Sequence, residues 1–70
     1  MKHDSAQKVT GLLEGAIQNM SLAISIAENE MEQNVFEAFK KEIGVSIGRV
    51  SMGADIVYKI HSDLTPPNLT

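Results

Sequence analysis

The chain is 70 residues long and contains no cysteine, so it forms at most one small domain and has no disulfide to reinforce it. A single core of this size supplies about 3–5 kcal/mol, which makes oligomerisation the expected source of further stability. The formal net charge of −3 argues against a broad electrostatic attraction for nucleic acid or for an anionic membrane surface.

The beginning of the sequence does not resemble an export signal. The stretch MKHDSAQK lacks the basic-then-apolar order of a secretory signal peptide. No later segment approaches the ~20 consecutive apolar residues that span a bilayer. We therefore expect a cytoplasmic protein that does not enter a membrane.

The first predicted helix covers residues 4–31. It begins at Asp4 or Ser5, whose short side chain can accept a hydrogen bond from a free backbone N–H, and Gln7 strengthens a cap at Asp4. Apolar residues then recur every three or four positions, as on one face of a helix. This main stripe consists of Val9, Leu13, Ala16, Met20, Ile24, Ala27 and Met31. A second row beside it consists of Leu12, Gly15, Asn19, Leu22 and Ile26.

A turn is predicted at residues 32–34, within the polar stretch ENEMEQN. Asn34 with Glu37 forms the preferred cap of the next helix, and Asn29 with Glu32 is the alternative. The stretch contains neither proline nor glycine, so one unbroken helix from about Asp4 to Leu64 remains a second interpretation.

The second predicted helix covers residues 35–63. Its main stripe consists of Phe36, Phe39, Ile43, Ile47, Val50, Ala54 and Val57, and His61 continues it. A second row consists of Ala38, Val45, Met52, Ile56 and Ile60. A strand at IGVSIGRV is less consistent, because the alternation of apolar residues ends after Gly48. Two consecutive prolines predict an extended tail at residues 65–70.

These patterns predict an all-α fold, in which residues 1–64 form one antiparallel helical hairpin of two long helices. A hairpin buries only the stripe that faces its partner helix, so the second rows would remain in water in a monomer. We therefore expect a homodimer that forms a four-helix bundle. The candidate interface consists of Leu12, Leu22, Ile26, Val45, Met52, Ile56, Ile60, Gly44 and Gly48.

Three glycines lie inside the second predicted helix, where each costs about 0.5–1 kcal/mol relative to alanine. Gly44 and Gly48 share a polar stripe with Ser51 and Asp55, so they are either simply exposed or admit a partner helix. Gly53 flanks the main stripe, and close packing is expected there.

The sequence offers little that points to catalysis. It contains no phosphate-binding loop, nucleophile elbow or zinc-hydrolase motif, and we expect no enzyme activity, cofactor or metal. Tyr58, His61 and Asp63 are close enough in sequence to form a hydrogen-bonded cluster, although a histidine at a helix end needs no further role. Carboxylates near the turn, at Glu28, Glu30 and Glu32, are expected to form a solvated cluster.

The favoured function is that of a non-enzymatic interaction protein, such as an adaptor, a chaperone-like partner or a regulatory subunit. Met20, Met31 and Met52 lie on apolar rows and are expected mainly to fill core space. A nucleic-acid-binding hairpin dimer is an alternative, which would use Lys40, Lys41, Arg49 and Lys59. A ligand- or metal-binding bundle around His61 is a third interpretation.

Overall fold

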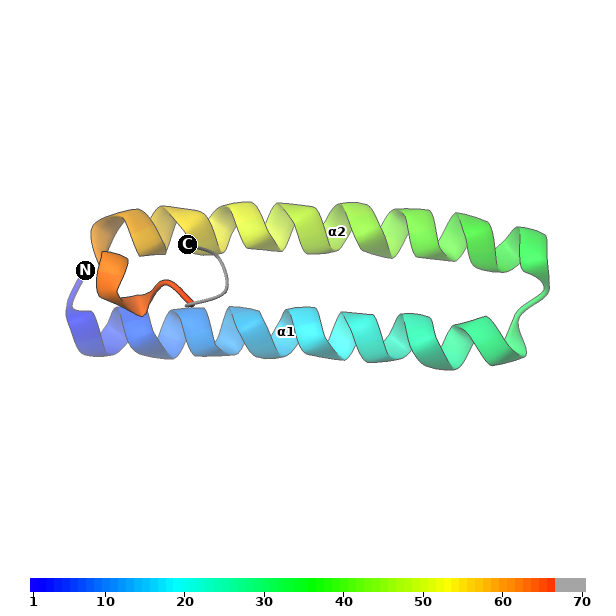
Figure 1. The fold of residues 1–70 in the computed structure, drawn as a ribbon, viewed down its shortest axis with the longest axis horizontal. Coiled ribbons are helices and arrows are strands. Elements are labelled where there is room, and N and C mark those ends of the chain that lie inside the picture. Colours follow the sequence, from blue (N-terminus) through cyan, green and yellow to red (C-terminus); the bar gives the residue numbers. More distant parts are fainter. Residues whose placement is uncertain (67–70) are drawn as a thin grey trace.

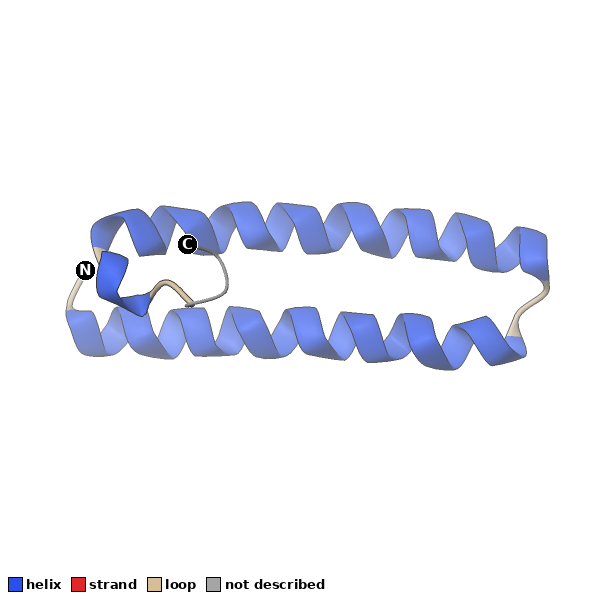
Figure 2. Cartoon of the chain, in the orientation of Figure 1, coloured by secondary structure: helices blue, strands red, loops and turns tan. Residues whose placement is uncertain are grey.

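The computed structural model describes residues 1–66 and contains two long antiparallel helices, α1 at His3–Glu30 and α2 at Gln33–Ile60 (Figure 1). A short 3₁₀ helix, η1, follows at Ser62–Leu64. The described residues contain no strand (Figure 2). The prediction of an all-helical hairpin is confirmed, and the single unbroken helix is excluded.

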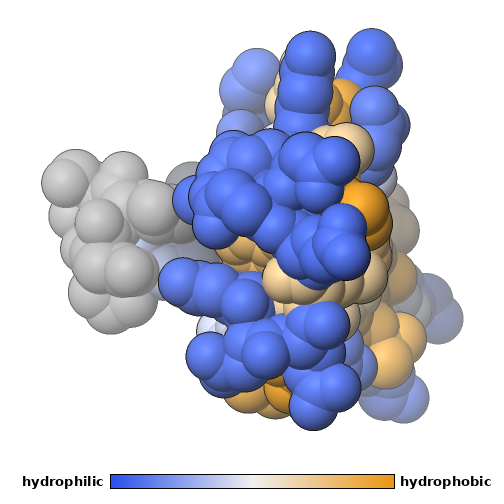
Figure 3. Space-filling view, turned by 90° about the vertical axis from the view of Figure 1, so that its right-hand side faces the viewer, coloured by the Kyte–Doolittle hydropathy of each residue, from blue (hydrophilic) through white to orange (hydrophobic). Residues whose placement is uncertain are grey.

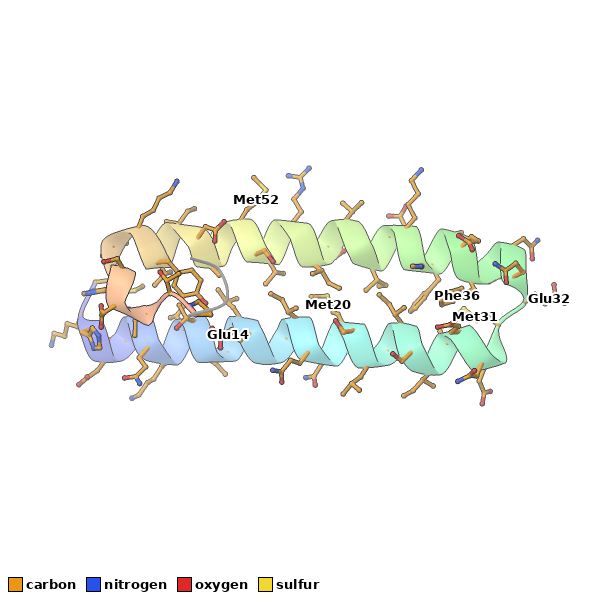
Figure 4. All side chains as sticks on the ribbon, viewed as in Figure 1. Glu14, Met20, Met31, Glu32, Phe36 and Met52 are labelled. Atoms are coloured by element: carbon orange, nitrogen blue, oxygen red, sulfur yellow. The ribbon has the colours of Figure 1, made fainter. Side chains whose placement is uncertain are left out.

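The chain reverses direction over two residues, Met31 and Glu32. Both have extended backbone conformations, with ψ near 150°. Beside this turn, Met31 and Phe36 point into the space between the helices (Figure 4). The turn is therefore shorter than the predicted turn at residues 32–34, and each helix is 28 residues long.

The predicted side-chain caps are wrong for both helices. Lys2 and Glu32 occupy the N-cap positions, and neither makes a side-chain hydrogen bond to the first turn. Asn34 instead lies inside the first turn of α2. The earlier start allows the Gln33 side-chain amide to donate to the Glu37 carboxylate at 2.8 Å, one turn along. A start at residue 35 would not hold these two side chains on a common helix face.

The main stripes of the two helices face each other and form the core. Its most buried residues are Ala6, Thr10, Ala27, Phe36, Ala54, Val57 and Tyr58. Three of them are alanines, which allow the helix backbones to approach, while Met20 fills the space farther along α1 (Figure 4). The Thr10 hydroxyl, although buried, donates to the Ala6 carbonyl oxygen at 3.1 Å and leaves no unpaired polar atom there. The core is a single narrow seam.

The second helix ends at Ile60, about three residues before the predicted end. His61 leaves the helical conformation, with φ −131° and ψ 82°. Ser62 and Asp63 follow in η1, because serine and aspartate favour turns over helix interiors. Thr65 is extended, and the rest of the predicted tail at residues 67–70 lies outside the described residues.

No atom of the hairpin approaches the glycines of α2 closely. A methyl group built on Gly44, Gly48 or Gly53 would meet no atom of residues 1–66 within 4 Å, apart from its chain neighbours and the helix's own backbone. The close packing predicted at Gly53 is therefore absent within the hairpin, and the backbone there is ordinary helix. All three positions have room for alanine.

Alanine at Gly44 or Gly48 should stabilise the protein. Each substitution removes backbone freedom from the unfolded chain and introduces no clash, so the free energy of unfolding should rise by up to about 1 kcal/mol. Urea unfolding of each single variant measures this change. A lower unfolding midpoint would contradict the expectation, and would mean that another chain packs against the backbone of α2 at that position.

Candidate interaction surface

A second set of apolar side chains lies outside the core. Its members are the seven large residues of the predicted interface, and each exposes more than half of its surface: Leu12, Leu22, Ile26, Val45, Met52, Ile56 and Ile60. Leu12 is the most exposed of them, at 75%. Met52 projects away from α1 (Figure 4). The core therefore uses only part of the apolar surface that the two helices carry.

Most of these residues lie toward one side of the hairpin, whereas Leu22 and Met52, about 170–180° from the buried stripe, point away from the neighbouring helix at its two outer edges. Successive helical residues are rotated by about 100°, which places the row on each helix about 120–140° from that helix's buried stripe. The rotation has the same sense on both helices when each is viewed from its own N-terminus. Because the helices are antiparallel, equal rotations of the same sense bring the two rows to a common side. We call this side the apolar face.

The distribution of hydropathy over the surface agrees with this construction. Seen from the turn end, orange surface gathers mainly on the right-hand side of the molecule, whereas the surface nearest the viewer is mostly blue (Figure 3). The hairpin therefore has one apolar and one polar side in addition to its internal core.

Charged and polar residues interrupt the apolar face at regular intervals. On α1, Lys8 and Asn19 stand in line with the row, and on α2 Glu42 and Arg49 do so. All four side chains are exposed. Within residues 1–66, no salt bridge includes Glu42 or Arg49. The face thus carries one unpaired charge of each sign on the same helix, seven residues apart.

The opposite, polar side contains a shallow groove of about 340 Å³. It is lined by Glu14, Ile17, Gln18, Ser51, Ala54, Asp55, Tyr58 and Pro66. The Tyr58 hydroxyl donates to Glu14 Oε1 at 2.7 Å and so links the two helices. This hydrogen bond, followed by burial and the negative charges of Glu14 and Asp55, raises the pKa of Tyr58 to about 12.

The raised pKa of Tyr58 gives a prediction for alkaline pH. The folded protein keeps the phenolic proton more tightly than the unfolded chain, so this stabilisation is fully present below pH 10.0 and is lost as the pH rises through about 12. Tyr58 is the only tyrosine, so its ultraviolet absorbance reports the titration directly.

Glu14→Gln should move the titration midpoint of Tyr58 back toward 10.0, because it replaces the charged carboxylate by a neutral amide oxygen, which is a weaker acceptor. Glu28→Gln, which lies outside the groove, serves as the control and should leave the midpoint unchanged. A midpoint near 10.0 in the unaltered protein would contradict the observed hydrogen bond.

The open end of the hairpin is held by two histidines. His3 Nε2 lies 2.6 Å from Asp63 Oδ2, and this contact holds the pKa of the Asp63 carboxyl below its usual value. His61 Nε2 donates to the Met1 carbonyl oxygen at 2.8 Å. The two imidazole rings meet edge to face, with centroids 5.2 Å apart. These contacts join the N-terminal segment to the residues that follow α2.

The cluster considered for Tyr58, His61 and Asp63 does not form, because each of these side chains has a different partner. Tyr58 bonds to Glu14, His61 to the backbone of Met1, and Asp63 to His3. Among residues 1–66, no three histidine or carboxylate side chains converge in a way that would hold a metal ion. Toward the open end of the hairpin, hydrogen bonds therefore join segments that are distant in the sequence.

The basic residues proposed for nucleic-acid binding do not share one face of α2. At about 100° per residue, Lys40 and Arg49 point to opposite sides of the helix, while Lys41 and Lys59 lie between them. Arg49 belongs to the apolar face. The carboxylates of Glu28, Glu30 and Glu32 are exposed near the turn, and the helices do not enclose them.

Comparisons with protein-family models, with curated proteins and with solved structures find no match to this chain. Neither α1 nor α2 contains an apolar run of the length and hydropathy needed to cross a bilayer. The functional argument therefore rests on the surface of the hairpin itself.

Proposed function

We propose that this protein is a small, non-enzymatic interaction protein that works by packing its apolar face against other helices, first of all those of a second copy. In this role it serves as an adaptor, a chaperone-like partner or a regulatory subunit. The observation that carries the proposal is the apolar face, where seven large side chains expose more than half of their surface.

Three further features support this function. Soluble monomers rarely expose contiguous apolar patches beyond a few hundred Å² unless the patch binds something. The core is a narrow seam between two helices, and such a core supplies little stabilisation to a chain of 70 residues. Helix packing would cover the apolar face and supply the missing burial, as in a four-helix bundle.

The proposal is tested by co-expressing two copies of the chain that carry different tags. Purification through one tag should retain the other copy, and Leu12→Glu in both copies should abolish this retention. Ser21→Glu is the matched control, because it adds the same charge to an exposed residue of α1 on the side away from the apolar face. The proposal would be contradicted if the unaltered chain and Leu12→Glu retained the second tagged copy, and every other co-purifying protein, to the same extent.

A further inference from the structure

We infer that the apolar face binds a second copy of the chain about a two-fold axis perpendicular to the long axis of the hairpin, so that α2 packs antiparallel to the partner's α2 and Glu42 pairs with the partner's Arg49. This inference rests on the proposed function and specifies its partner, its symmetry and the residues that set the register. It is carried by the spacing of charges and apolar residues along the two rows.

The surface area of the chain is consistent with a missing partner of this size. A compact monomer of 7.6 kDa is expected to expose roughly 4,300 Å². The hairpin exposes 5320 Å², which is larger by about 1,000 Å². A stable interface of standard size buries about 800 Å² on each partner. Covering the apolar face with a second copy would remove most of this excess.

Charge complementarity determines the direction of packing. Glu42 and Arg49 lie two helical turns apart in the α2 row, and both are exposed without an ion-pair partner in residues 1–66. When two copies of α2 run antiparallel about an axis midway between these residues, each Glu42 faces an Arg49 of the other copy. A two-fold axis forms this pair twice.

The same axis pairs the apolar residues of α2. In this register Val35, which is 51% exposed, lies opposite Ile56 of the other copy, which is 64% exposed. Ala38 lies opposite Gly53, where the backbone has room for a neighbouring side chain. Val45 lies next to the axis. Val35, Ala38, Gly53 and Ile56 therefore pair with one another when the row is reversed, as a two-fold interface requires, whereas Met52 and Ile60 meet no residue of the row.

The α1 row has its own centre at the same height along the hairpin. Its Leu12 and Leu22 are symmetric about residue 17, which lies thirteen residues before the end of α1 at Glu30. The midpoint of Glu42 and Arg49 lies between twelve and thirteen residues after the start of α2 at Gln33. One axis can therefore serve both helices. It places Leu12 level with the other copy's Leu22, which lies farther around α1, and it places Lys8 level with the other copy's Ile26.

The alternative two-fold axis, parallel to the long axis of the hairpin, places α1 opposite the partner's α2. Glu42 would then be level with Ser21, and Arg49 with Glu14, whose carboxylate is held by Tyr58 on the opposite side of the hairpin. The nearest residues of the α1 row are Leu22 and Gly15. Neither charge gains a partner of opposite sign, and leaving a carboxylate unpaired at an apolar contact is costly. Glu42 and Arg49 therefore pair with each other only about the perpendicular axis.

Charge reversal tests this arrangement. Glu42→Arg alone and Arg49→Glu alone should each weaken self-association at least tenfold, because each places like charges opposite one another twice. Mixing the two variants should restore association to within about threefold of the unaltered chain, since both pairs in the mixed dimer are then complementary. Sedimentation of each variant and of the equimolar mixture measures these constants.

The control pair is Glu28→Arg and Lys40→Glu, which makes the same charge changes at exposed residues away from the apolar face. These variants, alone or mixed, should associate like the unaltered chain. The perpendicular two-fold axis would be overturned if the Glu42 and Arg49 reversals left self-association unchanged. It would also be overturned if mixing the two variants did not increase their association. Either result would leave the proposed function standing. An unaltered chain that remains a folded monomer would overturn both.

Discussion

Replacing Leu12 by glutamate should weaken self-association by about 100-fold or more. Leu12 is 75% exposed in the single hairpin, and full burial of a leucine contributes about 1.5–3 kcal/mol. A two-fold interface contains two copies of Leu12, so about 3 kcal/mol or more is lost, and each 1.4 kcal/mol corresponds to a tenfold change in the dissociation constant. A buried carboxylate adds a desolvation penalty.

Sedimentation over a range of concentrations, with circular dichroism on the same samples, measures this effect. Ser21→Glu should leave the dissociation constant within about twofold of the unaltered chain, since a surface substitution away from the contact changes the free energy by less than about 0.5 kcal/mol. Above its own dissociation constant, Leu12→Glu should have normal helix content. Unchanged association of Leu12→Glu would mean that the apolar face is not the contact.

Replacing Phe36 by alanine should destabilise the hairpin by about 3–5 kcal/mol, the usual cost of removing a buried aromatic side chain. Phe36 is only 6% exposed and lies beside the turn, pointing into the space between the helices (Figure 4). In this narrow core, few neighbouring side chains can move to fill the cavity that the missing Phe36 ring would leave. A loss of this size approaches the whole stability of a small single domain.

Asn34→Ala is the control for Phe36→Ala. The structure places Asn34 inside the first turn of α2 without a capping hydrogen bond, so its replacement should change the free energy of unfolding by less than about 0.5 kcal/mol. Urea unfolding followed by circular dichroism compares the two variants. If Asn34→Ala lowered the free energy of unfolding by about 1 kcal/mol, Asn34 would be a cap as the sequence predicts. An equally small effect of Phe36→Ala would contradict the observed core.

The helical hairpin was predictable because its signal is periodic over the full length of each helix. The three-and-four spacing from Phe36 to Val57 is incompatible with a strand, and it is long enough to outweigh the glycines in α2. The same spacing separated the exposed row, including Val45 and Ile56, from the buried stripe. With 3.6 residues per turn, the sequence directly separates the side of a helix that contacts the other helix from the side that does not.

The ends of the helices were less predictable, because short polar residues are compatible with several cap positions. Asn34 has the side chain of a cap, but the pairing of Gln33 with Glu37 is compatible with an earlier start. His61 continues the apolar spacing, yet its ring donates to the Met1 backbone and the helix ends before it. Such choices depend on contacts with distant segments.

The contacts between distant residues had no signal in the sequence. Tyr58 and Glu14 are 44 residues apart, and His3 and Asp63 are 60 residues apart. Their pairing depends on the exact register of the two helices, which is determined by the length of the turn. A two-residue turn instead of a three-residue turn changes which side chains of α1 and α2 lie at the same height. Once that register is known, both pairs are expected, because the side chains are long enough to meet.

In the proposed dimer, a second copy of the chain covers the apolar face. The most direct test of this dimer is the mass of the unaltered protein in solution, measured by light scattering after size-exclusion chromatography. We expect a particle of twice 7.6 kDa with high helix content. A stable, fully helical particle of 7.6 kDa at every concentration examined would contradict it.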